Sequence, residues 1–155
     1  MMEKQLWKMP PLIKVYEAFG ALADGRTKLN DDQNATVASS DGSKEYQVTV
    51  IERGREVSSS DNASYWQGYL GYPAIAVLIA RGVIPAPREA MIPLGGIKWN
   101  VLNRRFKNHL KTIAEAERQA VARGGDLTMI REAARGVIAA LGDLRPARGS
   151  RPRPP

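Results

Sequence analysis

Residues 35–51 read ATVASSDGSKEYQVTVI, and this stretch decides the fold class. In its second half, apolar side chains stand at every other position from Tyr46 to Val50, which is typical of a half-buried strand. The dipeptide Asp41-Gly42 between the two halves is a strong hairpin signal, because both residue types tolerate the backbone of a tight turn. The sequence therefore predicts two antiparallel strands, residues 35–39 and 46–51, joined by that turn.

The segments around this hairpin extend the prediction in both directions. Gly54 marks a second turn and residues 56–60 resemble a weaker strand, so we expect a three-stranded antiparallel β-meander. Residues 10–24 carry apolar side chains at spacings of three and four, which predicts an amphipathic helix whose apolar face packs against the meander. Residues 74–81 are apolar almost throughout and predict a short, buried helix that begins at Pro73.

The second half of the chain has a helical pattern. Residues 85–97 contain three prolines and two glycines and are interpreted as a connector at a subdomain boundary. Residues 98–123 predict one long helix that ends at Gly124-Gly125, and Asp126 is a suitable cap for a last helix. The short connection favours an antiparallel helical hairpin over residues 98–144. The apolar stripe of the long helix consists of Trp99, Leu102, Phe106, Leu110 and Ile113. The expected fold class is α+β.

Both ends of the chain are expected to be irregular. Residues 1–9 lack the apolar core of a secretory signal, and we interpret them as a loose lead-in. Residues 145–155 hold four arginines, four prolines and no acidic residue, which is typical of a disordered basic tail. The chain has no cysteine, and its apolar runs are shorter than the ~20 residues that cross a bilayer. We therefore expect a cytoplasmic protein without a membrane partner.

The charge of the chain points to polyanionic partners. Its formal net charge is +7 and its pI is about 9.9, which favours nucleic acid or an anionic membrane surface, and charge alone does not choose between the two. A basic segment of fourteen residues without an acidic one contains Lys98, Arg104, Arg105, Lys107 and Lys111. In a continuous helix Arg104, Asn108 and Lys111 share one face. Two interpretations stay open for this segment: contacts to phosphates, and an ordinary solvated helix face.

A loop at residues 61–72 combines four aromatic side chains with two glycines. One interpretation is a platform on which nucleic-acid bases stack, with Tyr65 and Tyr69 as the rings that stay reachable. The other is that the rings, Trp66 among them, pack inward and complete the core. We favour the second interpretation, because large aromatic side chains beside glycine turns usually pack inward.

A series of short motifs precedes and follows this loop. Ala23-Asp24-Gly25, residues 37–42 and residues 46–48 come first, then Ser58-Ser59-Ser60, and after the loop Tyr72-Pro73-Ala74 leads into the apolar helix. In this order the chain resembles the SWIM domain, a small ββα zinc-binding module with Cys-x-Cys and Cys-x-His at the last two motifs. All four ligand positions are replaced here, by Ser58, Ser60, Tyr72 and Ala74.

The resemblance implies a ββα scaffold over residues 10–84 that has lost its zinc, because serine and tyrosine are poor zinc ligands and alanine is none. A structural zinc contributes to folding, so the aromatic loop is expected to replace it, with Tyr72 filling the volume of the metal. SWIM domains generally bind DNA or proteins, and the resemblance implies the same for this chain.

No catalytic constellation stands out in the sequence. His109 is the single histidine and is interpreted as a structural or surface residue, and no Walker A loop is present. We expect no enzyme activity, no metal and no cofactor. The expected function is a non-catalytic nucleic-acid-binding or adaptor module that uses the basic segment, the tail, Tyr65 and Tyr69. The alternative is a protein-interaction module or a homo-oligomer that associates through the helical stripe and the aromatic loop.

Overall fold

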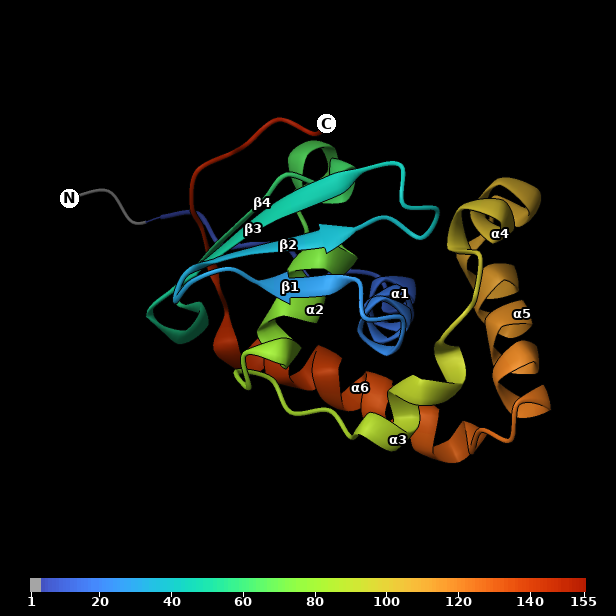
Figure 1. The fold of residues 1–155 in the computed structure, drawn as a ribbon. Helices are drawn as coiled ribbons and strands as arrows, with labels where there is room; N and C mark the ends of the chain where they lie inside the picture. Colours follow the sequence, from blue (N-terminus) through green and yellow to red (C-terminus); the bar gives the residue numbers. More distant parts are fainter. Residues whose placement is uncertain (1–3) are drawn as a thin grey trace.

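The computed structural model of the chain describes residues 4–155 and has an α+β fold (Figure 1). Its sheet contains five strands in chain order: β1 (Thr27–Leu29), β2 (Asn34–Ala38), β3 (Glu45–Ile51), β4 (Glu56–Ser59) and β5 (Ala147–Arg148). Neighbouring strands from β1 to β4 are antiparallel, and β5 is parallel to β4. The α+β class is confirmed, and the predicted meander corresponds to β2, β3 and β4. The sequence pattern did not indicate the two edge strands.

Hydrophobic alternation sets the register of the meander. Ala35 pairs with Val48, and Val50 pairs with Val57 across the turn η1 (Glu52–Gly54). These four side chains are buried together with Val37, because every second residue of a strand points to the same face of the sheet. The buried face lies against α2 (Tyr72–Ala80), which is apolar on all sides and buried from Pro73 to Ile79.

A central helix connects the sheet layer with the C-terminal helices. α1 (Leu12–Ala23) begins after Pro11 and is followed by Asp24 as its C-cap, close to the predicted end, and it packs on α2 on one side. On its other side lie α3 (Arg88–Met91), the 3-10 turn η3 (Ile92–Leu94), α5 (His109–Ala122) and α6 (Leu127–Leu144). Figure 1 shows α6 running beneath α1 and α2, while α4 (Trp99–Phe106) and α5 form one side of the molecule.

The connector at residues 85–97 is a packed part of the molecule. It folds into α3 and η3, and its residues Ala90 and Leu94 are completely buried. Their side chains belong to the same hydrophobic core as the sheet, α1 and the C-terminal helices. Asp126 caps α6 as predicted, since its side chain accepts a hydrogen bond from Met129 N.

The prediction of one long helix over residues 98–123 is wrong. α4 ends at Phe106 and α5 begins only at His109. Between them Lys107 adopts a left-handed backbone with φ 49°, and the Asn108 side chain accepts the N–H of Lys111 as a helix cap. Capping chemistry therefore overrides the apolar periodicity that favours a continuous helix.

This break changes which side chains reach the core. Leu110 belongs to the predicted apolar stripe, but it is 78% exposed, because α5 starts in a new direction and leaves this residue outside. Ile113, in the next turn, is buried. For the same reason Arg104 and Lys111 lie on two different helices, and their predicted common face does not form.

Segments near both ends pair with other segments in the part that the structure describes, where the sequence predicted a loose lead-in and a disordered tail. Trp7 is buried, and its indole Nε1–H donates to Val57 O at 2.9 Å. Ala147 and Arg148 form β5 beside β4. The open edge of β4 favours this pairing, because its unpaired backbone groups can bind an extended segment. Residues 1–3 of the predicted lead-in lie outside the described residues.

Candidate functional site

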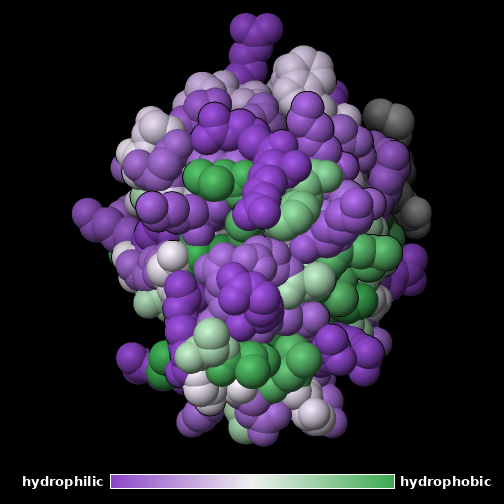
Figure 2. All heavy atoms as spheres, turned by 90° about the vertical axis from the view of Figure 1, so that its right-hand side faces the viewer, coloured by the Kyte–Doolittle hydropathy of each residue, from purple (hydrophilic) through white to green (hydrophobic). Residues whose placement is uncertain are grey.

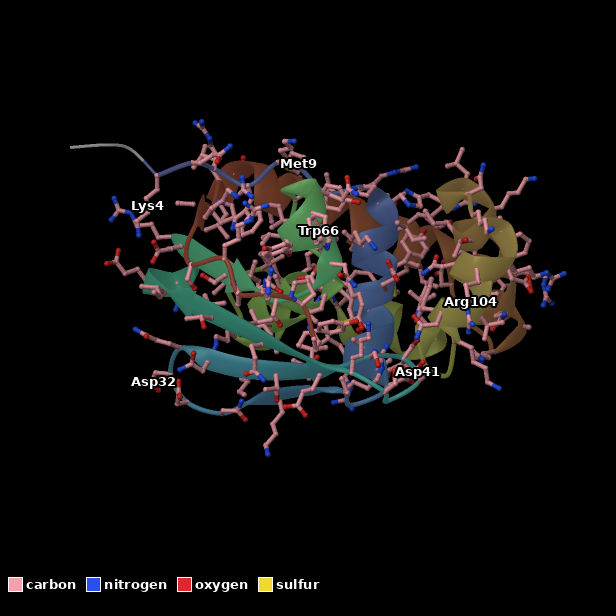
Figure 3. The ribbon with its side chains drawn as sticks, turned by 90° about the horizontal axis from the view of Figure 1, so that it is seen from above. Lys4, Met9, Asp32, Asp41, Trp66 and Arg104 are labelled. Carbon is pink, nitrogen blue, oxygen red and sulfur yellow. The ribbon has the colours of Figure 1, made fainter. Side chains whose placement is uncertain are left out.

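A polar groove of about 400 Å³ lies between the β2–β3 turn and α4. We call it the polar groove; it is lined by Ser39, Asp41, Ser43, Lys44, Tyr46, Asn62, Asn100, Asn103 and Arg104. Figure 3 shows Asp41 at the hairpin and Arg104 on the neighbouring helix. The groove joins segments that are far apart in the sequence, since Asn100 N donates to Ser40 Oγ at 3.4 Å.

The hairpin side of the polar groove is held by Asp41. Its carboxylate accepts hydrogen bonds from the Ser43 hydroxyl and backbone N–H and from the Ser39 hydroxyl. These bonds, that from the Ser43 side chain first, lower the pKa of Asp41 far below its usual range. These hydrogen bonds of the Asp41 carboxylate hold the turn together, and the turn forms one side of the polar groove.

Beneath the groove, a charged pair on α1 supports α4. Lys14 Nζ lies 3.1 Å from Glu17 Oε1, and Asn103 Nδ2 donates to Glu17 Oε2 at 3.2 Å. Burial lowers the pKa of Lys14, but the nearby Glu17 carboxylate raises it more, so the net pKa is above the ordinary value. The two charges pair with each other within the protein. Arg104, by contrast, has no carboxylate within ion-pair distance in residues 4–155, and only Asn100 O accepts from it.

A second hollow, of about 310 Å³, lies next to the polar groove and shares Asn62 with it. Its other lining residues are Tyr65, Trp66, Arg153, Pro154 and Pro155. We call Tyr65 and Trp66 the aromatic turn; they belong to η2 (Ala63–Gln67), a single π-helical turn. Figures 1 and 3 show this turn and α4 on the same, upper face of the molecule.

A buried hydrogen-bond network holds the aromatic turn in place. Asp61 is buried, and its carboxylate accepts from the hydroxyls of Ser59 at 2.5 Å and Ser64 at 2.7 Å. Asp61 also accepts the backbone N–H of Ser64 at 3.0 Å, and Gly71 N donates to Ser64 Oγ at 3.1 Å. The end of β4, the aromatic turn and the start of α2 are therefore tied to one carboxylate.

The rings are arranged differently from the favoured interpretation of the sequence. Trp66, which we expected in the core, is 68% exposed, so this part of the prediction is wrong. Tyr65 and Tyr69 are half-buried. The Tyr65 ring lies edge-on to Trp66 at 4.7 Å, and the guanidinium of Arg151 lies over Tyr65 at 4.7 Å. No periodic signal in the sequence distinguishes Trp66 from its neighbours, because a single π-helical turn has no repeat.

The predicted basic residues are all exposed but do not converge on one spot. Arg104 lines the polar groove, whereas Arg105 lies over the ring of Phe106 at 5.0 Å to its centroid. Lys98 precedes α4. Lys107 lies in the break between α4 and α5, and Lys111 lies in the first turn of α5. Of these five residues, Arg104 is the one that lines the polar groove, next to the β2–β3 turn.

The four positions where a SWIM domain would carry zinc ligands have separate surroundings here. Ser58 Oγ lies 3.3 Å from Ser150 Oγ of the tail, and Ser60 Oγ accepts a backbone N–H from β3. Tyr72 meets a β3 ring edge-on, and Ala74 is completely buried. Within the described residues no three His, Asp or Glu side chains gather as metal ligands would. The strands β3 and β4 followed by α2 keep the ββα order, and the resemblance remains a prediction.

Within residues 4–155, no helix combines the length and the apolar composition that crossing a bilayer requires.

Comparison with known proteins gives the chain a family. No curated protein and no solved structure matches the chain. A family model described as "Uncharacterised conserved protein UCP014422" matches residues 7–147, from the buried Trp7 to the first residue of β5. Since this match covers most of the sequence, the chain belongs to the family of uncharacterised conserved proteins UCP014422.

Proposed function

We propose that the protein binds single-stranded nucleic acid along the polar groove and the aromatic turn, without catalysing a reaction. The observation that carries this proposal is the position of Trp66, an exposed ring beside a hollow that continues through Asn62 into the polar groove with Arg104. An exposed aromatic ring stacks on a base, and a guanidinium group binds the phosphate of a neighbouring nucleotide.

Charge supports the same partner. The net charge is +7, and the sequence has no acidic residue between Lys98 and Glu115. Arg151 and Arg153 bring further positive charge to the aromatic turn from the tail. Neutralising phosphates releases counterions, so such a surface attracts nucleic acid without reading its sequence.

The geometry favours a single strand over a duplex. Trp66 can stack only on a base whose face is free, and in a duplex that face is covered by neighbouring base pairs. The acidic groups at the polar groove are already engaged, Asp41 in its turn and Glu17 with Lys14 and Asn103. This arrangement supports a binding role, because it offers no uncommitted carboxylate as a general acid or base.

Fluorescence anisotropy with labelled 12-nucleotide dT and rU strands tests the proposal at 50 and 200 mM salt. Trp66→Ala is expected to weaken binding by about 5- to 150-fold, because stacking contributes roughly 1–3 kcal/mol per base. Arg104→Ala is expected to weaken binding and to reduce the slope of log K against log salt by about 0.7. Trp66→Phe keeps a ring and retains most of the affinity.

Arg118→Ala is the matched control, because Arg118 is an exposed arginine whose guanidinium is held by Glu115 at 2.7 Å. It should bind like the wild type. The proposal is wrong if neither strand binds at 50 mM salt, or if Trp66→Ala and Arg104→Ala bind as tightly as Arg118→Ala.

A second candidate function is self-association through α4 and α5. Figure 2 shows apolar patches within the mainly hydrophilic face that these helices form. Leu110 is 78% exposed, Val101 49% and Val121 48%, so both helices carry apolar side chains that nothing in the described residues covers. Light scattering should then give a dimer mass that Leu110→Ser reduces to the monomer mass. A monomer at all concentrations excludes this candidate and leaves nucleic-acid binding untouched.

A further inference from the structure

An apolar pocket of about 200 Å³ lies where the N-terminal segment crosses the end of α6. It shares no lining residue with the polar groove or with the hollow at the aromatic turn. Trp7, Leu70 and Leu141 form its floor and are buried, and Met9 stands at its mouth with 49% of its surface exposed. The pocket is therefore continuous with the hydrophobic core and open to solvent at one side.

The volume limits what can enter. An apolar cavity of about 150 Å³ in a protein core accepts a benzene molecule. A pocket of about 200 Å³ therefore accepts one aromatic ring or a chain of roughly six to eight carbons, and nothing as large as a nucleotide.

Two cationic residues, Lys8 and Arg145, line the same pocket, and no acidic residue does. Neither has a carboxylate within ion-pair distance in the part of the chain that the structure describes. Cations beside an apolar pocket without a counterion favour an anionic group on the ligand.

The backbone at Arg145 supports a binding role for this residue. Arg145 ends α6 in a left-handed conformation with φ 47°, a position where glycine is the usual residue. A side chain at this position costs conformational free energy, and such strain is commonly found at binding sites. Within residues 4–155 the Arg145 guanidinium makes no side-chain hydrogen bond, and only its backbone N–H donates, to Leu141 O at 3.0 Å.

Gly142 contributes space to the pocket. It lies within α6, where glycine is unfavourable, and it lines the pocket. Gly142 is exposed, and a Cβ added there would meet no atom within 4 Å, so the absent side chain leaves this side of the pocket open.

We propose that this pocket binds a small amphipathic carboxylate, with its ring or short alkyl chain between Trp7, Leu70 and Leu141. Arg145 binds the carboxylate, and Lys8 adds to the positive potential at the mouth. This site is independent of the proposed nucleic-acid surface, and the two proposals fail separately, because different residues carry them.

Two-dimensional NMR on the full chain tests the proposal, with benzoate and octanoate as the aromatic and aliphatic probes. Saturable shifts of the Trp7 indole N–H are expected for at least one probe. The matched neutral probes, benzyl alcohol and octanol, should bind at least about tenfold more weakly, since a charge-assisted bond is lost.

Variants separate binding from folding. Arg145→Gly should weaken carboxylate binding about tenfold and raise the melting temperature, because it removes the guanidinium and the strained φ together. Arg53→Gly is the control: Arg53 has φ 56° and lies in η1, so its replacement should raise the melting temperature and leave binding unchanged. Gly142→Leu should abolish binding in a folded protein by filling the pocket.

Three results overturn the proposal. One is the absence of saturable Trp7 shifts up to about 10 mM of either probe, a concentration at which even affinities weaker than millimolar are visible. Another is equal binding of the neutral and charged probes. The third is unchanged carboxylate affinity in both Arg145→Gly and a folded Gly142→Leu.

Discussion

The hydroxyl of Tyr16 on α1 donates a hydrogen bond of 2.7 Å to Glu117 Oε2 on α5, although 101 residues separate them. The same carboxylate is bound by Arg131 of α6 through two bonds of 2.8 and 3.0 Å. Burial raises the pKa of Tyr16, and the bond to Glu117 raises it further, so the phenol remains a donor at neutral pH. One carboxylate thus joins the three helices α1, α5 and α6.

Replacing Glu117 by glutamine should destabilise the protein by about 1–3 kcal/mol, because Arg131 loses its ion pair and an uncharged amide accepts the Tyr16 bond less well. Glu115→Gln is the control, since Glu115 binds Arg118 one turn away on the same surface helix. Its cost should stay within about 0.5 kcal/mol. Urea unfolding measures both, and equal costs would show that the Tyr16–Glu117–Arg131 network contributes nothing of its own.

The contribution of Glu117 to stability should be lost in acid. Burial raises the pKa of Glu117, but the bonds from Arg131 and Tyr16 lower it more, so its net pKa is below the ordinary value of 4.5. An acid with a lowered pKa stabilises the fold fully above its unfolded-state pKa, and this contribution is lost as pH falls through the folded-state pKa. The stability difference between wild type and Glu117→Gln should therefore be constant from pH 7 to about 5 and shrink towards pH 3. A difference that is the same at pH 3 and pH 7 contradicts this assignment.

Gly71 is expected to be intolerant of any side chain. A Cβ at this position would overlap the carboxylate of Asp61, which holds the aromatic turn. Gly71→Ala should therefore lower the free energy of unfolding by about 2–4 kcal/mol, the scale of a disrupted buried polar network. The matched control is Gly136→Ala in α6, where the new methyl group meets no atom within 4 Å. Because alanine favours a helix more than glycine does, the free energy of unfolding should rise by about 0.5–1 kcal/mol. Thermal unfolding of the two variants distinguishes these opposite signs.

The three tryptophans should differ sharply in solvent access. Trp7 and Trp99 are buried, whereas Trp66 is 68% exposed. Acrylamide quenching of the wild-type fluorescence should show one accessible, red-shifted component that Trp66→Phe removes. The same replacement should leave the melting temperature within about two degrees, since an exposed surface substitution changes stability little. If quenching persists unchanged in Trp66→Phe, the aromatic turn packs inward and the nucleic-acid proposal loses its stacking ring.

Local patterns predicted the elements whose causes are local. The alternation from Tyr46 to Val50 and the Asp41-Gly42 turn suffice for the β2–β3 hairpin. Apolar spacing and proline placement suffice for α1 and α2, and Asp126 suffices for the start of α6. The break after Phe106 also had a local signal, because Asn108 is a preferred capping residue, but the longer apolar stripe outweighed it in the reading of the sequence.

The candidate site was predictable only in part. Arg104 was among the predicted residues, but its separation from Arg105 and Lys111 depends on the helix break and on how α4 packs against the hairpin. Trp66 was expected in the core, but it is exposed on a turn whose hydrogen bonds, made by Asp61 and Ser64, join three segments of the chain.

By itself, then, the sequence determined the α+β class, the meander, the helices α1 and α2 and the positive charge, because periodicity, turn residues and composition act within a few neighbouring residues. Only the tertiary structure decided that the tail pairs with β4, that Trp7 is buried against Val57, and that an apolar pocket forms at the end of α6. Each of these depends on a contact between segments distant in the chain. Such contacts are selected by the shape and unsatisfied backbone groups of a surface that exists only after folding.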